Sequence, residues 1–527
     1  MTKLRIPDQR EAGILMAMAA TIFGAWLRLF IPAIAGFPVN DGGLFYVMIR
    51  AIQQHGFQLP PYVHYNGIEI PFAYPPLGFY LGAALSNVFH VDATQILRWA
   101  PATILILSIP AFYFLSRTLL GTEFKAGLAT LVFAFTPRAI TWQIMGGGLT
   151  RSLGLFLMLL ALTSIYRLFI NRDRRDLLLA TLLSTLLSLS HPEAALQTIG
   201  LALLFWLFAG RDRQRTLLAL YVALGTVAGS GLWWIPTLFR LGPEPFLAAA
   251  QTGAHSTLGI LYPFFALITD EPLMTFIAVL GLLGFVICLA KKQYLLPAAY
   301  ILPFIVEPRS AATYAMIPLA LLASVSLADV IFPALAGMQH VSPDQPLVSR
   351  AVQGSLLFIL AYLFGSGFYY GGRLAATTLM PSDRAAFEWV RANTQTDSRF
   401  LILTGVEEVF CDSVSEWFPA LTGRTSVTTI QGNEWLTGSY RTASATQAIT
   451  QHCLLEGEPL GCVEDEAHKA GLNFNYVYVS KKVKVQNLCR VTATLPGHEG
   501  LVAALKSNPG YKPVFESELV AIFARQR

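Results

Sequence analysis

Two neighbouring stretches decide the fold of this chain: NDGGLFYVMIRAI at residues 40–52 and YPPLGFYLGAALSNVF at residues 74–89. They follow a first hydrophobic segment, residues 13–35, which is long enough to cross a bilayer and is typical of a signal-anchor. Asp41 is thereby placed at the membrane surface. The proline-marked stretch beside it is suited to lie in the interface as an amphipathic helix. A carboxylate in this position can act on a substrate carried by a lipid.

The composition is that of a membrane protein with many spans. Hydrophobic residues make up 54% of the 527 residues and charged residues only 13%, with a mean hydropathy of +0.53. These values lie outside the range of soluble domains. The formal net charge of +5 is small, and the lysines and arginines are scattered between hydrophobic segments. This distribution favours membrane orientation and argues against a nucleic-acid partner.

Cysteine is concentrated near the C-terminus. Cys288 lies in a hydrophobic segment, whereas Cys411, Cys453, Cys462 and Cys489 all fall in the polar last part of the chain. On an oxidising side of the membrane these four predict two disulfides, with three connectivities open. Cys453 and Cys462 are close enough in sequence to close a small loop. The alternative is four unpaired cysteines that pack as small hydrophobic residues.

Hydrophobicity marks twelve segments, several of them shorter than the roughly 20 residues of an ideal span. They are residues 13–35, 74–91, 96–117, 126–144, 150–170, 177–191, 194–209, 216–236, 273–290, 294–306, 311–331 and 351–371.

Basic clusters indicate which loops face the cytoplasm. NRDRRD (171–176), RDRQR (211–215) and the lysine pair 291–292 belong inside by the positive-inside rule. The count of spans from these clusters agrees with the count from the basic N-terminus only if segment 74–91 does not cross. We therefore predict eleven spans, with segment 74–91 as an interfacial helix in a long first external loop, residues 36–95. The N-terminus is then cytoplasmic and the C-terminus extracytoplasmic.

The last part of the chain differs in composition from the rest. Residues 373–527 are polar and mix helix and strand signals. SDRAAFEWVRAN (382–393) has a serine N-cap and a hydrophobic face. Strands are indicated at residues 399–405, 475–480 and 518–524. We expect a polytopic α-helical membrane domain over residues 1–372 and a small extracytoplasmic α/β domain over residues 373–527.

Asp41 is the candidate catalytic group. Gly42 and Gly43 follow it and let the backbone approach another surface closely. Asp before a helical turn is a favoured N-cap. It is also suited to be a general base that takes a proton from an acceptor hydroxyl. One carboxylate can do both.

Arg309 lies in EPRSAATYAMIP (307–318), at the outer end of a span, where an unpaired charge is costly. Glu307 is near enough to pair with it. The other partner is the phosphate of a lipid substrate, which a guanidinium binds through paired donors. We favour the phosphate, because charges at membrane depth tend to be functional.

The loop MGGGLTRSLG (145–154) packs three glycines before a span. It is either a backbone nest for an anion, assisted by Arg151, or a tight turn with a snorkelling arginine. It has no P-loop lysine and no dinucleotide spacing, which argues against a nucleotide site. Arg28, in the first span, is expected to snorkel to the outer interface.

Two more polar pairs lie on the predicted outer face. His191 and Glu193, in SHPEAA, either relay a proton or contact substrate, or they flank a proline that breaks two spans. Asp270 and Glu271 either interact with a helix dipole or form one side of a metal or acceptor site. No His/Cys cluster has the spacing of a zinc site.

The order of these parts resembles the GT-C superfamily of membrane glycosyltransferases. They share a first span, an external loop with an early Asp, a PPL-type helix and an arginine near the outer end of a late span. Within the superfamily the chain is most similar to the oligosaccharyltransferase catalytic subunit and the protein mannosyltransferase-like group. The resemblance implies a polyprenyl-phosphate sugar donor, Asp41 as the essential first-loop acid and Arg309 at the lipid phosphate. SEWFPALTGRTSV (415–427) lies where oligosaccharyltransferases have a Trp-rich acceptor motif, with Glu416 and Trp417 nearest to it.

One departure from the family pattern concerns metal. Oligosaccharyltransferases have an acidic pair in the second external loop that helps to hold a divalent metal, whereas residues 150–152 here read Thr-Arg-Ser. The resemblance therefore favours a metal-independent transferase without a cofactor, as in the protein mannosyltransferase and aminoarabinose transferase branches. If a metal were bound, Asp41, Asp270 and Glu271 would be its ligands.

We therefore expect a glycosyltransferase of the plasma membrane. It would move sugar from a polyprenyl-phosphate donor to a hydroxyl of a glycan, lipid or protein on the external face. Asp41 is the expected catalytic residue, and the expected substrate contacts are Arg309, Arg151, Arg138, Glu307, His191, Glu193, Tyr74 and Trp417.

Two other functions are alternatives to this one. A transporter or flippase for a lipid-linked precursor predicts an inverted repeat and charge near the bilayer midplane, and the sequence shows neither. A degenerate subunit that only binds lipid is suggested by the missing second-loop acids, whereas the presence of Asp41 argues against it.

Overall fold

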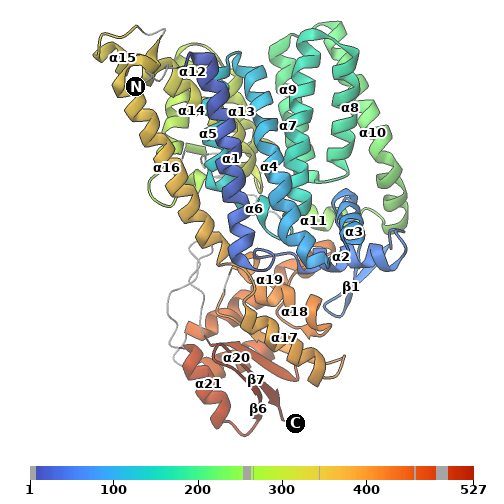
Figure 1. Ribbon diagram of the computed structural model, residues 1–527. Helices are drawn as coiled ribbons and strands as arrows, with labels where there is room; N and C mark the ends of the chain where they lie inside the picture. The colour runs from blue at the N-terminus through green and yellow to red at the C-terminus, as the bar shows by residue number, and fades with distance from the viewer. Residues whose placement is uncertain are drawn as a thin grey trace.

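The computed structural model describes residues 7–252, 261, 263–264, 266–342, 345–406, 408–455, 458–481 and 497–526. Figure 1 shows a bundle of long helices with a smaller unit of helices and strands at one end of it. We call this smaller part, residues 381–526, the C-terminal unit.

Each predicted span falls on a helix of the bundle. These helices are α1 (Gln9–Ala35), α4 (Ala93–Leu120), α5 (Glu123–Phe135), α7 (Gly148–Asn171), α8 (Arg174–Ser188), α9 (Pro192–Ala209), α10 (Arg213–Leu241), α12 (Phe276–Ala290), α13 (Leu295–Val306), α14 (Ala311–Ser326) and α16 (Arg350–Ala375). A π-helical segment, Leu327–Ile331, connects α14 to α15 (Phe332–Met338).

Seven helices in the described part of the chain are long and apolar enough to cross a membrane. They are α1, α4, α7, α9, α10, the stretch Ala311–Met338 and α16. The other four predicted spans, α5, α8, α12 and α13, have 13, 15, 15 and 12 residues. The chain is thus a membrane protein with several spans, and the number of eleven stays a prediction.

The predicted span 126–144 is wrong at its outer end. Helix α5 stops at Phe135, and Thr136 is extended (ψ 118°) before Pro137. A residue that precedes proline disfavours the helical region, so the helix ends there. A short 3-10 turn (Pro137–Ala139) and α6 (Thr141–Ile144) follow.

The loop between α1 and α4 holds most of the small elements near the C-terminal unit. It contains α2 (Gly43–Gln54), the antiparallel hairpin β1 (Tyr62–Tyr65) and β2 (Ile68–Pro71), and α3 (Leu77–Phe89). Helix α3 matches the predicted helix 74–91. It lies at the end of the bundle that faces the C-terminal unit (Figure 1), and its last residues, Val88 and Phe89, are exposed. An exposed apolar helix end suits a membrane interface.

The C-terminal unit has a five-stranded sheet in the order β4-β3-β5-β7-β6. Strands β4, β3 and β5 are parallel, whereas β7 and β6 form an antiparallel hairpin. The strands are β3 (Arg399–Leu403), β4 (Thr425–Ser426), β5 (Tyr476–Ser480), β6 (Tyr511–Glu516) and β7 (Val520–Arg525). The helices are α17 (Pro381–Asn393), α18 (Ser413–Thr422), α19 (Ser439–His452), α20 (Pro459–Lys469) and α21 (Gly497–Ser507).

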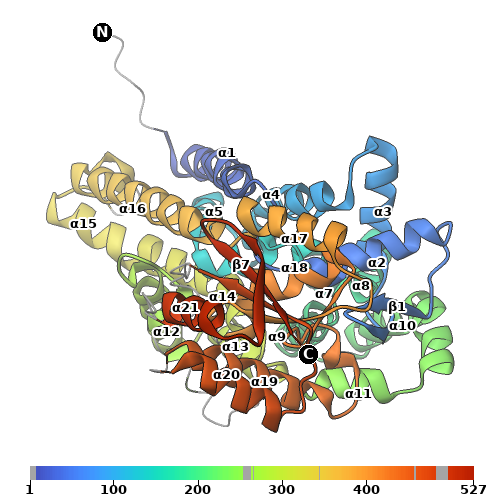
Figure 2. The same ribbon diagram turned by 90° about the horizontal axis from the view of Figure 1, so that it is seen from below.

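The predicted helix 382–393 and the three predicted strands are all present in this unit. The helix begins at Pro381 with Met380 as its N-cap, so the predicted serine cap at Ser382 is wrong. Figure 2 looks along the bundle from the side of the C-terminal unit. The sheet and its helices lie over the central helices, while α15, α10 and α3 extend beyond them.

One of the candidate disulfides is present. Cys453 and Cys462 are bonded, and Cys411 is also in a disulfide. Cys489 lies outside the described residues. Cys288 is a free cysteine, buried in α12. The pattern fits an oxidising compartment around the C-terminal unit.

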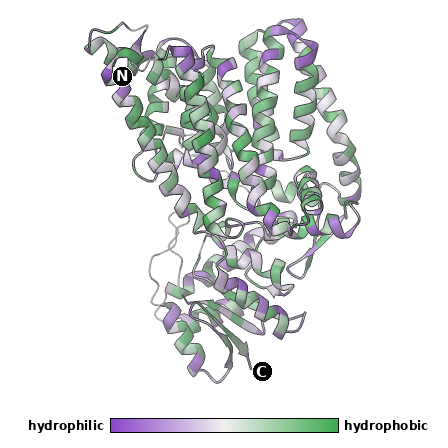
Figure 3. Ribbon diagram, viewed as in Figure 1, coloured by the Kyte–Doolittle hydropathy of each residue, from purple (hydrophilic) through white to green (hydrophobic). Residues whose placement is uncertain are grey.

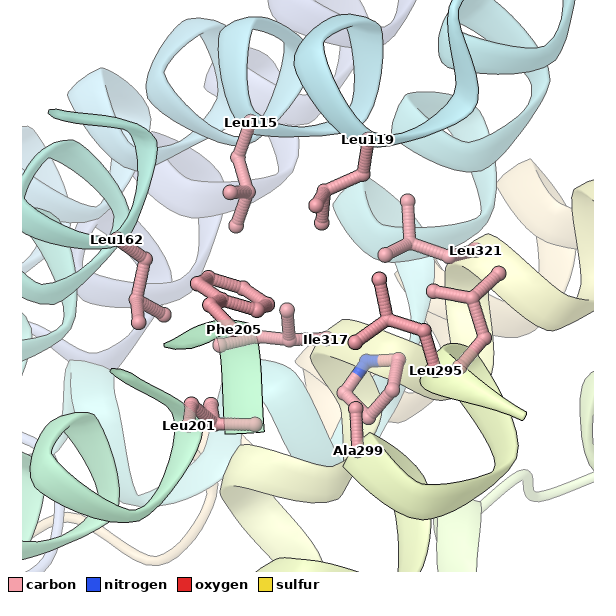
Figure 4. A pocket seen from close by; sticks show the side chains of 11 residues that line it. Leu115, Leu119, Leu162, Leu201, Phe205, Leu295, Ala299, Ile317 and Leu321 are labelled. Atoms are coloured by element: carbon pink, nitrogen blue, oxygen red, sulfur yellow. The ribbon is translucent and has the colours of Figure 1, made fainter. Parts of the chain in front are cut away.

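An apolar cavity lies inside the bundle between α4, α7, α9, α13 and α14 (Figure 4). Leucines, Phe205 and Ile317 point into it, and its volume is about 20 Å³. A space of this size holds about one water molecule, and apolar cavities stay dry. It is therefore a packing gap and is too small for a lipid chain.

Candidate active site

Asp41 bridges the first loop and the start of α7. Its Oδ1 accepts a hydrogen bond of 2.9 Å from the Gly147 N–H, and its Oδ2 lies 2.5 Å from Nη2 of Arg151. The N-cap of α2 is Gly42, without a side-chain hydrogen bond. Asp41 therefore does not cap α2, and its carboxylate is turned toward the glycine loop and the first turn of α7.

Glycines make this approach possible. A Cβ on Gly147 would lie 2.8 Å from Asp41 Oδ2, and one on Gly146 would lie 2.0 Å from the Asp41 carbonyl oxygen. The predicted backbone nest of this loop is thus in contact with the protein's own carboxylate, through the Gly147 N–H. Arg151 is part of the same contact, so it is not merely a snorkelling side chain.

The Asp41–Arg151 pair is also fixed from the other side. Arg151 Nη1 donates to the Trp142 carbonyl oxygen at 2.8 Å, and the guanidinium lies 5.7 Å from the centre of the Trp142 ring. The side chains of Asp41 and Arg151 are 15% and 21% exposed. The pair is therefore held in place and still reachable.

Arg151 covers one oxygen of the Asp41 carboxylate. The guanidinium occupies the position from which a metal ion would contact Oδ2, and a second cation there would be repelled. Among the described residues there is no group of three or more His, Cys, Asp and Glu side chains that could hold a metal ion.

Tyr74 and His191 lie next to this pair. The Tyr74 hydroxyl is 3.1 Å from Thr150 Oγ1, and its ring meets the rings of His191 and Trp435 edge-on at 6.3 and 5.9 Å. Burial raises the pKa of Tyr74 to about 12. Tyr74 therefore offers a neutral hydroxyl and not a phenolate.

His191 caps helix α9. Its Nδ1 accepts a hydrogen bond of 3.3 Å from the Ala194 N–H. Burial, with the charges of Arg151 and Arg309, lowers the pKa of His191 to about 3. The imidazole is therefore neutral near pH 7, which argues against the alternative in which His191 relays a proton.

Arg309 is the more open of the two arginines, with 44% of its side chain exposed. Its Nη1 donates to Thr252 Oγ1 at 3.0 Å, Nε lies 3.8 Å from Glu193 Oε1, and the guanidinium lies 5.9 Å from the centre of the Phe410 ring. The suggested pairing of its charge with Glu307 is wrong. Glu307 accepts from the N–H groups of Arg309 and Ser310 and from the Ser310 hydroxyl. Glu307 thus closes the turn before α14.

Arg138, Asp270 and Glu271 form a second cluster. Arg138 Nη1 lies 3.2 Å from Asp270 Oδ2, and burial raises the pKa of Asp270. Glu271 accepts from the N–H groups of Ile277 and Ala278 in the first turn of α12. The helix-terminus interpretation therefore holds for Glu271, and Asp270 is engaged by an arginine.

Arg28 does not snorkel to the interface. It is fully buried, and its Nη1 donates to the carbonyl oxygens of Gly24 and Ala134 at 3.0 and 2.9 Å. Ala134 belongs to the last turn of α5, whose carbonyls lack helical partners. Arg28 thus satisfies a helix end that the sequence did not predict.

Solved structures share this architecture. The chain matches the oligosaccharyltransferase of Archaeoglobus fulgidus with a TM-score of 0.57 and 14% identity, over 89% of this chain and 69% of that one. It matches ArnT from Cupriavidus metallidurans bound to undecaprenyl phosphate with a TM-score of 0.53 and 14% identity, over 97% of each chain. It matches the arabinofuranosyltransferase AftD from Mycobacteria with a TM-score of 0.53 and 16% identity, over 96% of this chain and 40% of that one. This is the GT-C fold.

Comparisons of the sequence alone give one partial match. A family model described as "6-pyruvoyl-tetrahydropterin synthase related domain; membrane protein" matches residues 73–322 of this GT-C fold. No curated protein matches the chain.

The sequence did not predict all of the residues around the site of this GT-C fold. Trp142, Phe410 and Trp435 come from three separate elements, and no spacing in the sequence relates them to Asp41. Trp417 was a predicted substrate contact, but it is fully buried, and its indole N–H donates to the Asn40 carbonyl oxygen at 2.9 Å. It therefore does not face a substrate in this structure.

Proposed function

We propose that this protein moves a sugar from a polyprenyl-phosphate donor to an acceptor hydroxyl at the membrane surface. The observation that carries the proposal is a fixed carboxylate, Asp41, paired with Arg151, together with a second, more exposed arginine, Arg309, which lies near Glu193. The charges of both Arg151 and Arg309 lower the pKa of Tyr74 and of His191, which supports one shared site for the two arginines. The fold is shared with three sugar transferases, one of them solved with undecaprenyl phosphate.

In the proposed reaction, Asp41 accepts the proton of the acceptor hydroxyl as its oxygen attacks the anomeric carbon. The bond from that carbon to the phosphate oxygen breaks, and the electron pair leaves with the polyprenyl phosphate. Arg309 binds the phosphate and stabilises the charge that develops on it. A single displacement of this kind inverts the anomeric configuration.

Arg151 provides the positive charge next to the base. It holds the carboxylate in one orientation through Nη2 and is itself held by the Trp142 carbonyl. Because this fixed guanidinium already supplies a positive charge beside the carboxylate, we propose that the reaction is metal-independent. The oligosaccharyltransferase of A. fulgidus, in contrast, has been solved in complex with Zn and sulfate (TM-score 0.54, 15% identity, 88% of this chain and 68% of that one).

The test uses the purified full-length protein and a panel of polyprenyl-phosphate sugars. Sugar release or transfer is measured with and without a chelator, for the wild type, for Asp41→Asn and for Asp92→Asn as a control. Asp92 caps α4 in the same external loop, and asparagine caps a helix as well as aspartate does. We expect turnover of one donor that survives chelation, disappears in Asp41→Asn and is unchanged in Asp92→Asn.

Other results would overturn parts of the proposal. Wild-type turnover by Asp41→Asn would show that Asp41 is not the general base. Activity that is lost to the chelator would mean that a metal takes part. Tight binding of one donor without turnover would favour a lipid-binding role.

A further inference from the structure

The C-terminal unit touches the catalytic loop through helix α18. Glu416 Oε1 accepts hydrogen bonds from the N–H groups of Gly42 and Gly43, at 2.9 and 3.0 Å. Trp417 Nε1 donates to the Asn40 carbonyl oxygen at 2.9 Å. Two of these bonds hold the peptide groups directly before and after Asp41, and the third holds the next peptide group, across 373 to 377 residues of sequence.

Two further bonds connect the same parts of the chain. Asn40 Nδ2 donates to the Phe410 carbonyl oxygen at 2.7 Å, just before α18. The Tyr65 hydroxyl, from β1, donates to the Glu416 carbonyl oxygen at 2.6 Å. The contact is therefore built from both side chains and backbone.

The loop can approach α18 closely because Gly42 and Gly43 have no side chains. Gly42 has φ 127°, a conformation that side chains rarely adopt, and a Cβ there would lie 3.0 Å from Trp417 Cζ2. A Cβ on Gly43 would lie 2.5 Å from the Glu416 carbonyl oxygen. The two glycines are thus explained by close approach to α18.

Asp41 is held both through its side chain and through its neighbouring backbone. The glycine loop and Arg151 of α7 contact its carboxylate, whereas α18 contacts the backbone on either side of it. Both Glu416 and Trp417 are buried, at 6% and 0% exposure. Glu416 Oε1 and Trp417 Nε1 are already bonded to the loop, which favours a role in holding the loop over binding of an acceptor.

We propose that Glu416 and Trp417 are positioning residues, through which the C-terminal unit sets the place and direction of the Asp41 carboxylate. This inference rests on the proposed function of Asp41. It assigns the SEWF segment to the catalytic loop and not to recognition of the acceptor. The activity of the membrane part thereby depends on how the C-terminal unit is seated.

Glu416 acts here as a hydrogen-bond acceptor. Burial and the nearby charge of Asp41 raise the pKa of Glu416. Glutamine has the same shape and keeps a carbonyl oxygen that can accept from both N–H groups. Alanine removes that oxygen and leaves two backbone donors unsatisfied.

The test compares Glu416→Gln, Glu416→Ala and Trp417→Phe in the full-length protein, with the exposed Glu388→Ala of α17 as a control. Turnover and the KM for the donor are measured with the polyprenyl-phosphate sugar that the wild type uses. We expect Glu416→Ala to lower kcat roughly 100-fold, as a misplaced catalytic group does, with an unchanged KM for the donor. Glu416→Gln should stay within about threefold of the wild type, since its acceptor is kept.

Trp417→Phe keeps the ring and loses only the N–H bond to Asn40, so it tests the inference if Glu416→Ala does not fold. We expect a lower kcat with the same KM for the donor. A raised KM for the acceptor with an unchanged kcat, in either variant, would assign SEWF to acceptor binding and overturn the inference.

A second measurement needs no substrate and separates this inference from the proposed function. Hydrogen exchange of the amides of Gly42 and Gly43 should be slow in the wild type and in Glu416→Gln. It should be at least about tenfold faster in Glu416→Ala, because the acceptor is gone. Equal exchange in all variants would show that Glu416 does not hold the loop, whatever the protein's activity.

Discussion

Arg151 stands where related transferases are expected to have an acid of the second loop. Its guanidinium lies 2.5 Å from Asp41 Oδ2 and is anchored by the Trp142 carbonyl. Charge-assisted hydrogen bonds of this length are among the strong ones, and they are directional. A lysine in this place would give a charge without the planar fork. In the proposed reaction, the guanidinium of Arg151 takes the place of the metal ion that an acidic pair in this loop would help to hold.

The lowered pKa of His191 leads to a prediction about how folding stability depends on pH. Its pKa falls from the usual 6.5 to about 3 in the folded protein, because it is buried beside Arg151 and Arg309. Between these values the unfolded chain binds the extra proton, so folding stability decreases as the pH is lowered from 6.5 toward 3. We expect His191→Asn, which keeps a helix cap, to show a smaller loss of thermal stability between pH 6.5 and pH 5 than the wild type.

The measurement is the unfolding temperature in detergent across that pH range. His55, on the exposed end of α2, serves as the matched control when replaced by asparagine. An acid slope that is identical in the wild type and in His191→Asn would contradict the assignment of a depressed pKa.

At the scale of loops and helices, the clearest prediction concerns Gly146, where the glycine loop contacts the first loop. A methyl group at this position would meet the Asp41 carbonyl oxygen at 2.0 Å and the Pro38 Cβ at 3.1 Å. Both are parts of the backbone or of a ring, so neither can rotate away. Gly146→Ala should push the first loop from the start of α7 and lower turnover on the order of 100-fold, as a displacement of about 1 Å at a catalytic group does.

Gly354→Ala is the control for this change. Gly354 lies inside α16 with open space around it, so alanine there should leave turnover unchanged and stabilise the helix by about 0.5–1 kcal/mol. The test measures the turnover and the thermal unfolding of both variants. If Gly146→Ala were as active as the wild type, the close contact of the two loops would not matter for catalysis.

The helices could be predicted from the sequence better than the contacts between them. Long apolar segments locate helices because the burial of apolar surface dominates their energetics. The end of α5 was missed because a single dipeptide, Thr136–Pro137, overrides the apolar pattern. Arg28 was misplaced for a related reason, since its partner is the carbonyl of Ala134 at that unpredicted helix end.

The sequence predicts which residues belong to the site but not which of them contact one another. Asp41, Arg151 and Arg309 were identified from residue type and membrane depth. The pairing of Asp41 with Arg151 spans 110 residues, and the bond of Gly42 to Glu416 spans 374. Pairings of that range depend on how the helices pack, and no local pattern encodes them. Glu307 shows the reverse case, because its nearness in sequence to Arg309 suggested a pairing of side chains that does not form.

The distribution of charge and the disulfide agree about the orientation of the protein. Hydrophilic residues gather at the ends of α7, α8, α9 and α10 that lie far from the C-terminal unit (Figure 3). The basic clusters 171–176 and 211–215 are in these turns. Basic loops favour the cytoplasm, and the Cys453–Cys462 disulfide favours an oxidising compartment. We therefore predict that the catalytic loop and the C-terminal unit lie outside.

Reporter fusions test this orientation. Alkaline phosphatase, which needs disulfides, should be active when fused after residue 526, whereas a fluorescent protein that matures only in the cytoplasm should stay dark there. Fusions in the turn at residues 291–292 should show the opposite pattern. Fluorescence at both places would mean an even number of crossings between the two points. It would place Asp41 and the C-terminal unit on the cytoplasmic side and require a donor that is presented there.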